Sequence, residues 1–552
     1  IQLSKTSVAY PWQLNCAALW RVFYARECIM KVRSDILRTY QGVHTWTGII
    51  AGLVLFIGFY AGSLTMFKHE IQQWAAPIQA PKITSSNYDY QTLVDTAINE
   101  RGEQLAKGFN LDLHTQGAPL SWYIKGNARG MELDKKLNFA HLNADGTLNV
   151  SAQTENELAD LVDYLHRTAG FIGEIGHDQS GVYILGIACV LYFLALVSGV
   201  IILLPTLVKT FFALRKEKGP SRFWLDSHNL IGIASLPFHL VIAFTVVVFA
   251  FHDFIYGGLA QFYDGKPLFQ RPTPAAQSFH IENLPRIDEQ VLAAKNYAPG
   301  YEPIHIRYSN LNSASPSAVF MMSNNNTVVR GPDTDYLFMN PYTLEVVNSS
   351  YPQGEDAVWG NMVASIFSLH FGTYGGDWGR WGYFIMGLLG AFLFYSGNLL
   401  WIDKRFKKDP NKRSTLFMAR LTIGVCLGSM IAVAFTLVAA KWLPTLVSNT
   451  NYATLYSYYA AFFVFVIYSF LNPVQKATTA GFYILTSLCA LMVLSTLLKL
   501  ASSDVNTLFY SSYMVDIVAA VFAAIFFKMA KRQQQKQTTQ NIMPAFEQAS
   551  RA

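Results

Sequence analysis

The sequence is short of charge and of cysteine. Charged residues make up 14% of the 552 residues and hydrophobic residues 52%, whereas soluble domains carry about 25% charged residues. This shortage excludes an ordinary soluble protein and predicts a polytopic membrane protein. The few cysteines form no CxxC pair, and three of them fall in apolar runs, so we expect neither a disulfide framework nor a thiolate metal site. They are Cys16, Cys28, Cys189, Cys426 and Cys489.

Common cofactor and metal motifs are missing as well. No GxGxxG lies at a strand-to-helix turn, so the chain is not expected to bind FAD or NAD(P)H through a Rossmann unit. No HExxH is present, which argues against a hydrolytic zinc site. The formal net charge of +6 is clustered in short loops, and it therefore reports membrane topology rather than a nucleic-acid partner.

Eight apolar runs are long enough to cross about 30 Å of hydrocarbon at about 1.5 Å per residue. They lie near residues 43–67, 181–205, 229–252, 382–402, 416–441, 453–471, 479–500 and 507–528. Basic residues cluster beside four of these runs, at 31–38, 209–222, 404–413 and 528–536. The positive-inside rule places these clusters and both termini in the cytoplasm. The two long polar stretches between spans then lie outside, in a bacterial periplasm.

The expected fold is an all-α polytopic membrane protein with two small α+β domains outside the bilayer. Residues 1–29 lack an uninterrupted apolar core and are read as a leader ahead of Met30 or as an interfacial helix. The expected segments are a leader or interfacial segment (1–34), a first span (35–69), an outer domain (70–175), a second span (176–207), a cytoplasmic loop (208–225), a third span (226–254), a second outer domain (255–365), a hairpin with the fourth span (366–405), a four-helix membrane extension (406–530) and a cytoplasmic tail (531–552).

The first four spans form two halves with similar sequence patterns, and duplication is the simplest explanation. Each half consists of a span, an outer domain and a second span. Ser198-Gly199 in the second span is matched by Ser396-Gly397 in the fourth. A histidine also precedes a glycine at the mouth of each of the four spans. These histidines are His44, His166, His228 and His370.

Four histidines at matching positions favour a common role. One histidine at a helix end is most simply a headgroup-level residue, but neutral imidazole is also the usual axial donor to haem iron. His44 and His228 belong to the cytoplasmic ends of the spans, and His166 and His370 to the outer ends. We therefore expect one ligand pair near each face, binding two haem b groups and forming a path for electrons across the membrane.

Three further histidines are alternative ligands. His239 follows His228 by eleven residues, which returns it to within about 20° of the same helix face; it could bind a more central haem or be a hydrogen-bonded core residue. His69 shares the face of His44 at the outer end of the first span. His252 turns about 120° away from His228 and is read as interfacial.

Aromatic and cationic side chains gather around the His370 hairpin and beside His166. They form either a docking surface for a substrate outside the membrane or an ordinary interfacial belt of Trp and Tyr. The candidates are Arg167, Trp359, Tyr374, Trp378, Arg380 and Trp381.

The segment from Leu165-His166-Arg167-Thr168 to Gly173-Glu174-Ile175-Gly176, together with Leu369-His370-Phe371-Gly372 and Asp226-Ser227-His228, resembles the PepSY-associated transmembrane-helix family over about residues 35–405. The resemblance implies that the outer domains are PepSY-like modules. It also implies a FoxB-type siderophore reductase of the inner membrane, with b-type haem on membrane histidines. The chain departs from the family pattern at Thr45 and Asn229, where arginine is usual, and in its C-terminal helices.

The expected activity is a haem-dependent ferric reductase. It would pass electrons from a cytoplasmic flavin reductase or from membrane quinol to a periplasmic ferric siderophore or other ferric chelate, and so release Fe(II), because ferrous iron is held far less tightly by hard oxygen ligands. Two rival classes remain: a non-redox PepSY regulatory or binding protein with structural histidines, and a transporter for iron or its chelate with Asp516 in a proton path.

Overall fold

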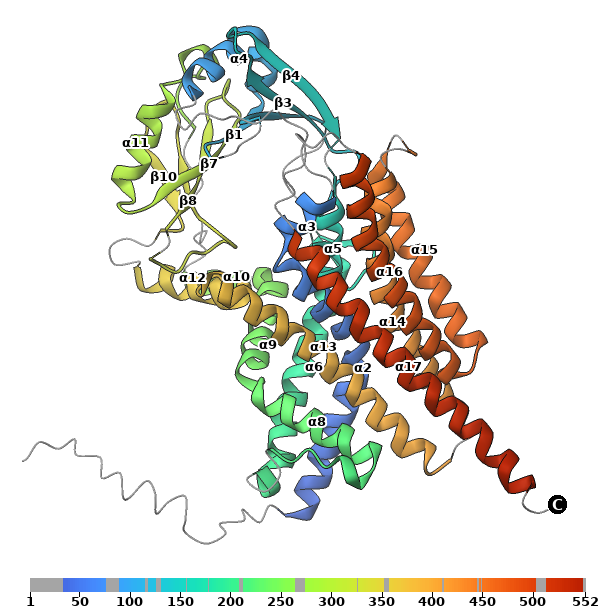
Figure 1. Cartoon of the computed structure of the whole chain (residues 1–552). Coiled ribbons are helices and arrows are strands. Elements are labelled where there is room, and N and C mark those ends of the chain that lie inside the picture. The colour runs from blue at the N-terminus through green and yellow to red at the C-terminus, as the bar shows by residue number, and fades with distance from the viewer. Residues whose placement is uncertain are drawn as a thin grey trace, which may run out of the picture.

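The computed structural model describes residues 33–75, 89–114, 118–125, 131–154, 156–176, 178–207, 212–263, 274–324, 326–351, 357–409, 412–443, 446–447, 449–502 and 513–549. A bundle of long helices lies on one side of the molecule and a domain built on a β-sheet on the other (Figure 1). We call the end of the bundle next to this sheet the sheet end, and the opposite end the basic end. The expected leader, residues 1–29, lies outside the described residues.

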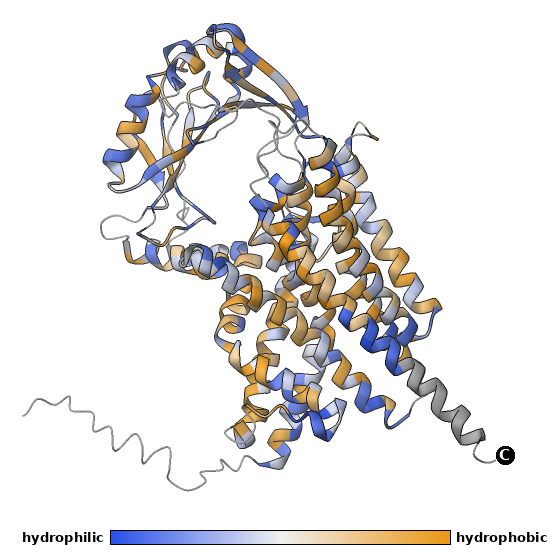
Figure 2. Ribbon diagram, in the orientation of Figure 1, coloured by the Kyte–Doolittle hydropathy of each residue, from blue (hydrophilic) through white to orange (hydrophobic). Residues whose placement is uncertain are grey.

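Seven helices of the described residues are long and apolar enough to cross a membrane. Their apolar residues form a continuous band along the bundle (Figure 2), because a spanning helix satisfies its backbone groups internally and can present side chains to lipid. These helices are α2 (Ser34–Thr65), α6 (Ser180–Leu203), α13 (Gly376–Phe406), α14 (Arg413–Trp442), α15 (Thr450–Leu471), α16 (Val474–Ser502) and α17 (Tyr513–Ala549).

The third expected span is broken in the middle. Residues 226–254 were predicted as one helix, but α8 (Pro220–Ala234) and α9 (Leu236–Ala250) meet at an angle of 68°. Pro237 sits in the first turn of α9. Proline has no N–H to donate and its ring clashes with the carbonyl four residues earlier, so a straight helix cannot pass through this position.

The two polar stretches, in which outer domains were expected at 70–175 and 255–365, contribute to one continuous sheet. The sheet has eight strands in the order β10-β9-β8-β7-β1-β2-β3-β4. The halves join where β1 pairs antiparallel with β7, from Gly108 opposite Ser309 to Asp112 opposite His305. The strands are β1 (Gly108–Asp112), β2 (Leu120–Lys125), β3 (Lys136–Leu142), β4 (Leu148–Thr154), β7 (Glu302–Ser309), β8 (Ser317–Ser323), β9 (Asp335–Met339) and β10 (Val346–Ser349).

Each half of the sheet domain repeats the order helix, four strands, helix. The first half runs from α4 (Tyr90–Leu105) to α5 (Leu158–Thr168), and the second from α11 (Ile287–Tyr297) to α12 (Ala357–Phe371). The chain then enters α6 or α13. His370 was expected at the opening of the fourth span, but it lies in the last turn of α12, the same place that His166 has in α5.

Short elements complete the connections. The helices α3 (Lys68–Ala75) and α10 (His252–Ala260) lie at the sheet end, and the strands β5 (Glu174–Ile175) and β6 (Asp178–Gln179) pair just before α6. Single 3-10 turns occupy Leu204–Thr206, Lys216–Lys218, Gln261–Tyr263 and Ile281–Asn283.

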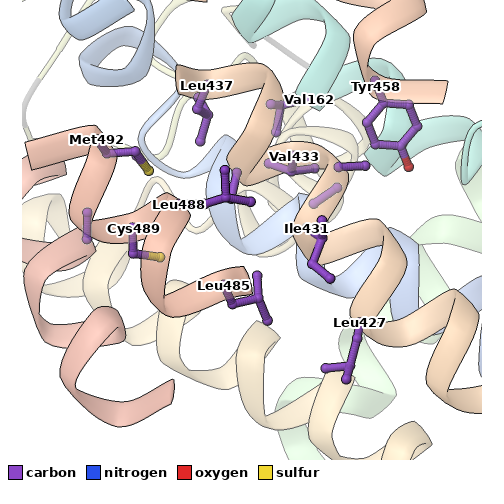
Figure 3. Packing of buried hydrophobic residues seen from close by; sticks show 14 of the residues in the cluster. Val162, Leu427, Ile431, Val433, Leu437, Tyr458, Leu485, Leu488, Cys489 and Met492 are labelled. Atoms are coloured by element: carbon purple, nitrogen blue, oxygen red, sulfur yellow. The ribbon is translucent and has the colours of Figure 1, made fainter. Parts of the chain in front are cut away.

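Separate apolar cores hold the sheet domain and the bundle together. The sheet is packed against α4 and α11 through residues such as Leu93, Phe109 and Tyr308. In the bundle, α14 is the central helix of a cluster to which α5 and α16 contribute, as the inward-pointing side chains of Val162, Leu437 and Leu488 illustrate (Figure 3). The helix that carries His166 is therefore fixed against the C-terminal helices.

Candidate functional site

The four predicted histidines come together as two pairs. His166 and His370 form the sheet-end pair, with ring centroids 6.0 Å apart and ring planes inclined by 32°. His44 and His228 form the basic-end pair, with centroids 6.3 Å apart and planes inclined by 78°. Each pair takes one histidine from each half of the repeat. The sequence analysis grouped the same histidines by the ends of the spans at which they lie.

In the basic-end pair, hydrogen bonds fix which nitrogen of each ring carries the proton. His44 Nδ1 lies 2.8 Å from the carbonyl oxygen of Ala195; a carbonyl only accepts, so Nδ1–H is the donor. His228 Nδ1 lies 2.9 Å from Ser396 Oγ, whose own hydrogen is donated to the carbonyl of Leu393. Nδ1–H of His228 is again the donor, and both rings keep an unprotonated Nε2 as neutral imidazoles.

The sheet-end pair follows the same rule with different partners. His166 Nδ1 donates to the carbonyl oxygen of Gly58 over 2.9 Å. His370 Nδ1 lies 2.9 Å from Thr245 Oγ1, and Thr245 donates its hydroxyl hydrogen to Val241. All four histidines therefore hold Nδ1–H in a hydrogen bond and leave the Nε2 lone pair for a metal, which is the arrangement of most histidine ligands in metalloproteins.

Glycines allow these rings to lie close to neighbouring helices. A Cβ added at Gly62 would lie 2.5 Å from His166 Nδ1, and one at Gly199 would lie 3.0 Å from a ring carbon of His44. A Cβ at Gly397 would lie 3.5 Å from a ring carbon of His228, an ordinary van der Waals contact. The matched Ser-Gly pairs of the sequence thus place a glycine against each histidine of the basic-end pair.

A large cavity opens at the sheet-end pair. It has a volume of about 1890 Å³ and runs from His166 and His370 to the sheet domain, where Arg307 and the segment 326–329 line it. Small-molecule sites usually measure about 300–1,000 Å³. This cavity can therefore admit a bulky ligand, and it leads that ligand to the sheet-end pair.

The three alternative histidines lie apart from both pairs. His239 is fully buried between the rings of Phe59 and Tyr192, and neither of its ring nitrogens has a hydrogen-bond partner among the described residues. His69 is hydrogen-bonded to Gln73 and borders the cavity. His252 begins α10 and contacts Asp253.

The predicted docking residues divide between the cavity and other surfaces. Arg167, Tyr374 and Arg380 line the cavity, and Arg380 is held there by Glu70, 2.6 Å away. Trp381 packs on Phe67 instead. Trp378 is 89% exposed and is not among the residues that line the cavity. The side chain of Trp359 lies outside the described residues.

Several residues of the site gave no recognisable signal in the sequence. Thr245 and the carbonyls of Gly58 and Ala195 anchor the rings, yet threonines and backbone groups of this kind occur throughout apolar helices. Arg307 reaches the cavity only because β7 pairs with β1. Ser396 could be found, since the Ser-Gly repeat drew attention to it.

The ring separation in both pairs is compatible with a metal held between two imidazoles. With metal–nitrogen bonds of about 2.0 Å and an imidazole ring radius of about 1.1 Å, two rings on opposite sides of one ion have centroids about 6.2 Å apart. The observed separations are 6.0 and 6.3 Å. Two neutral imidazoles form a donor set that suits haem iron, so the residues of both pairs fit haem b.

The fold and the two pairs define a multi-pass membrane protein with a sheet domain at one end and paired histidines inside its helices. A family model described as the PepSY-associated TM region matches residues 41–404, and the chain belongs to this family. The match ends in the last turn of α13, so α14 to α17 lie beyond it. A comparison with curated proteins finds no match.

Proposed function

We propose that the protein is a transmembrane haem b oxidoreductase that carries electrons through the inner membrane and reduces a ferric siderophore or another ferric chelate at the sheet end, releasing Fe(II). The observation that carries this proposal is that all four imidazoles have the same hydrogen-bonding arrangement. Each pair lies about 6 Å apart, with Nδ1–H occupied and Nε2 available. Haem bound at each pair would supply reversible one-electron transfer.

The chain's own residues would orient the cofactors and exclude water from them. The carbonyls of Ala195 and Gly58 and the hydroxyls of Ser396 and Thr245 hold the four rings in place. The packed helices around His44 and His228 keep that pair inside the bundle. At the sheet end the cavity leaves His166 and His370 accessible to a ligand from outside.

The proposed orientation places the basic end in the cytoplasm and the sheet end in the periplasm. Basic residues gather at the helix ends and short connections of the basic end, as the positive-inside rule requires of a cytoplasmic face; they include Lys216, Arg222, Lys404 and Lys407. The electron donor would then be a cytoplasmic flavin reductase or membrane quinol. Reduction alone would release the iron, since hard oxygen chelators hold Fe(III) far more tightly than Fe(II).

The first prediction concerns haem content. The protein purified in detergent should contain two b-type haems and show a sharp α-band when reduced by dithionite. His166→Ala and His370→Ala should each remove the sheet-end haem. His44→Ala and His228→Ala should each remove the basic-end haem. In each case the remaining histidine of the pair is left as a single ligand. The measurement is a pyridine haemochrome assay combined with a redox titration.

The matched control is His114→Ala, since His114 is an exposed histidine of the sheet domain; this variant should keep both centres. A colourless wild-type protein would refute the proposal. Loss of both centres from each of the four substitutions would refute the assignment of two separate pairs. A ferrous-trapping assay with ferric hydroxamates then tests the acceptor, and iron uptake into proteoliposomes without reduction would favour transport.

A further inference from the structure

A second group of metal-ligating side chains lies at the sheet end. It consists of Asp178 in β6 and of His252 and Asp253 at the start of α10, and their potential ligand atoms all lie within 4.8 Å of one another. The segments that carry them are far apart in the sequence and meet where α6 and α9 reach the sheet end. Tyr183, one turn into α6, lies beside Asp178.

The contacts of His252 leave Nε2 as the ring nitrogen that faces the group. His252 Nδ1 lies 2.7 Å from the carbonyl oxygen of Phe249, so Nδ1 carries a hydrogen. Nε2 lies 3.2 Å from a carboxylate oxygen of Asp253, where a proton makes the contact an ion pair and a divalent metal ion could take the place of that proton. The carboxylate of Asp178 lies within the same 4.8 Å and supplies a third ligand atom.

The group borders the cavity described above. Asp178 and His252 line it, as do His166 and His370. One imidazole and two carboxylates form a mixed nitrogen and oxygen donor set, which suits divalent first-row metals such as Fe²⁺ and Mn²⁺. Three protein ligands leave positions open for water, so an ion could enter from the cavity and leave again.

We propose that Asp178, His252 and Asp253 form a divalent-metal site that receives the ferrous ion after it leaves its chelator in the cavity. The identity of the cargo rests on the proposed reductase function. The existence of the site rests only on the three side chains. Their carboxylates would attract the released cation and keep it from the departing chelator, and the solvent-exposed side of Asp253 would let it exchange.

Binding of Mn²⁺ to the full-length protein in detergent tests the site directly. Free Mn²⁺ gives a strong EPR signal that falls on binding, so the assay needs neither a chelate nor a reductant. The wild type should bind one Mn²⁺ per chain with micromolar to submillimolar affinity. Asp178→Asn, His252→Ala and Asp253→Asn should each weaken binding at least tenfold, because each removes one of three ligands.

The matched control is Asp145→Asn, which removes an exposed carboxylate from the turn between β3 and β4; its affinity should equal that of the wild type. Asp253 is partly exposed, so its substitution leaves folding intact even where that of Asp178 does not. Unchanged affinity in the three variants would overturn the proposal, as would a wild type that binds no Mn²⁺.

The two proposals fail separately. If the protein contains haem and reduces ferric chelates but binds neither Mn²⁺ nor Fe²⁺, the metal site alone is refuted. If it binds Mn²⁺ through these residues but contains no haem, the site stands and its role in receiving reduced iron is refuted. If the three variants retain both haem spectra and lose Mn²⁺ and Fe²⁺ binding, both the position and the independence of the site are supported.

Discussion

At the scale of single residues, the positions of the histidine rings depend on their close approach to the backbone of glycines. Gly62 in α2 stands against His166, and Gly199 in α6 stands against His44. A methyl group at either position would have to displace the ring, because each imidazole is also tied to a neighbouring helix through Nδ1. These glycines therefore position the histidines without touching a ligand themselves.

Gly62→Ala should selectively disturb the sheet-end pair. The new Cβ would lie 2.5 Å from His166 Nδ1, so the ring must move and its bond to Gly58 must break. We expect at least a tenfold loss of haem at the sheet-end pair, as for other groups that orient metal-binding histidines, with the basic-end centre unchanged. The measurement is the resolved redox titration of the two centres.

Gly48→Ala is the control for this substitution, since a Cβ at Gly48 in the same helix meets nothing within 4 Å. It should leave both centres as they are. Equal loss of haem in the two alanine variants would show that helix α2 tolerates no change at all, and would contradict the specific role given to Gly62.

At the scale of helices, a buried charged network joins α3 to the C-terminal helices. Lys441 of α14 lies over the ring of Trp74 at 3.5 Å and is hydrogen-bonded to Thr496 of α16. Thr496 donates to Asp516 over 2.9 Å, and Trp74 donates to the same oxygen over 3.1 Å. The sequence singled out Asp516 but offered no partner for it. The structure supplies Trp74 and Thr496, with Lys441 next in the network.

Lys441→Met should destabilise the protein strongly, because it leaves the carboxylate of Asp516 buried without the cation that is linked to it through Thr496. Removing one member of a buried pair costs about 3–5 kcal/mol, whereas replacing both by apolar residues is often neutral. The double variant Lys441→Met with Asp516→Leu should therefore unfold at a higher temperature than Lys441→Met alone. Thermal unfolding in detergent, followed by intrinsic fluorescence, measures this.

The control is Lys531→Met on the exposed face of α17, which should change stability by no more than about 0.5 kcal/mol. If the double variant were less stable than Lys441→Met, the two charges would not be coupled, and the network would instead be a set of independent contacts.

At the scale of the whole molecule, the four helices beyond the family match support the helix that carries His166. Asn451 accepts a hydrogen bond from the backbone of Glu157 just before α5, and Tyr459 donates to the carbonyl of Gly170 just after it. Leu161 of α5 is part of the same apolar cluster as α14 and α16. The C-terminal helices thus hold α5 at both ends and along its face.

A chain that ends after residue 409 should therefore lose the sheet-end centre first. We expect its sheet-end haem content to fall at least tenfold, while the basic-end pair, held by α6 and α13, keeps its haem. Haem per chain and the redox titration measure the two centres. A chain that ends after Lys536 is the control and should match the full protein. If the chain that ends after residue 409 kept both centres equally, this role for α14 to α17 would be contradicted.

Much of the membrane part could be predicted, because long apolar runs report spans directly. The pairing of His44 with His228 and of His166 with His370 also followed from their positions at the ends of repeated spans. The joined sheet could not be predicted, since pairing of β1 with β7 connects segments nearly two hundred residues apart. The break before Pro237 could have been predicted from the proline itself, but the long apolar run around it favoured a single span. The position of His370 in α12 was missed because residues 357–371 were not recognised as a separate helix.

The pairing of β1 with β7 has a consequence for the origin of the chain. An antiparallel strand pair relates its two members by a two-fold axis, as does an isologous contact between identical subunits. Neither half contains a complete histidine pair: each pair takes one ring from each. An ancestor the length of one half could have assembled either pair only as a homodimer, in which each pair is one histidine and its symmetry copy across the axis. Fusion of two copies of the gene would have kept that dimer in one chain and freed the two members of each pair to diverge in sequence and surroundings.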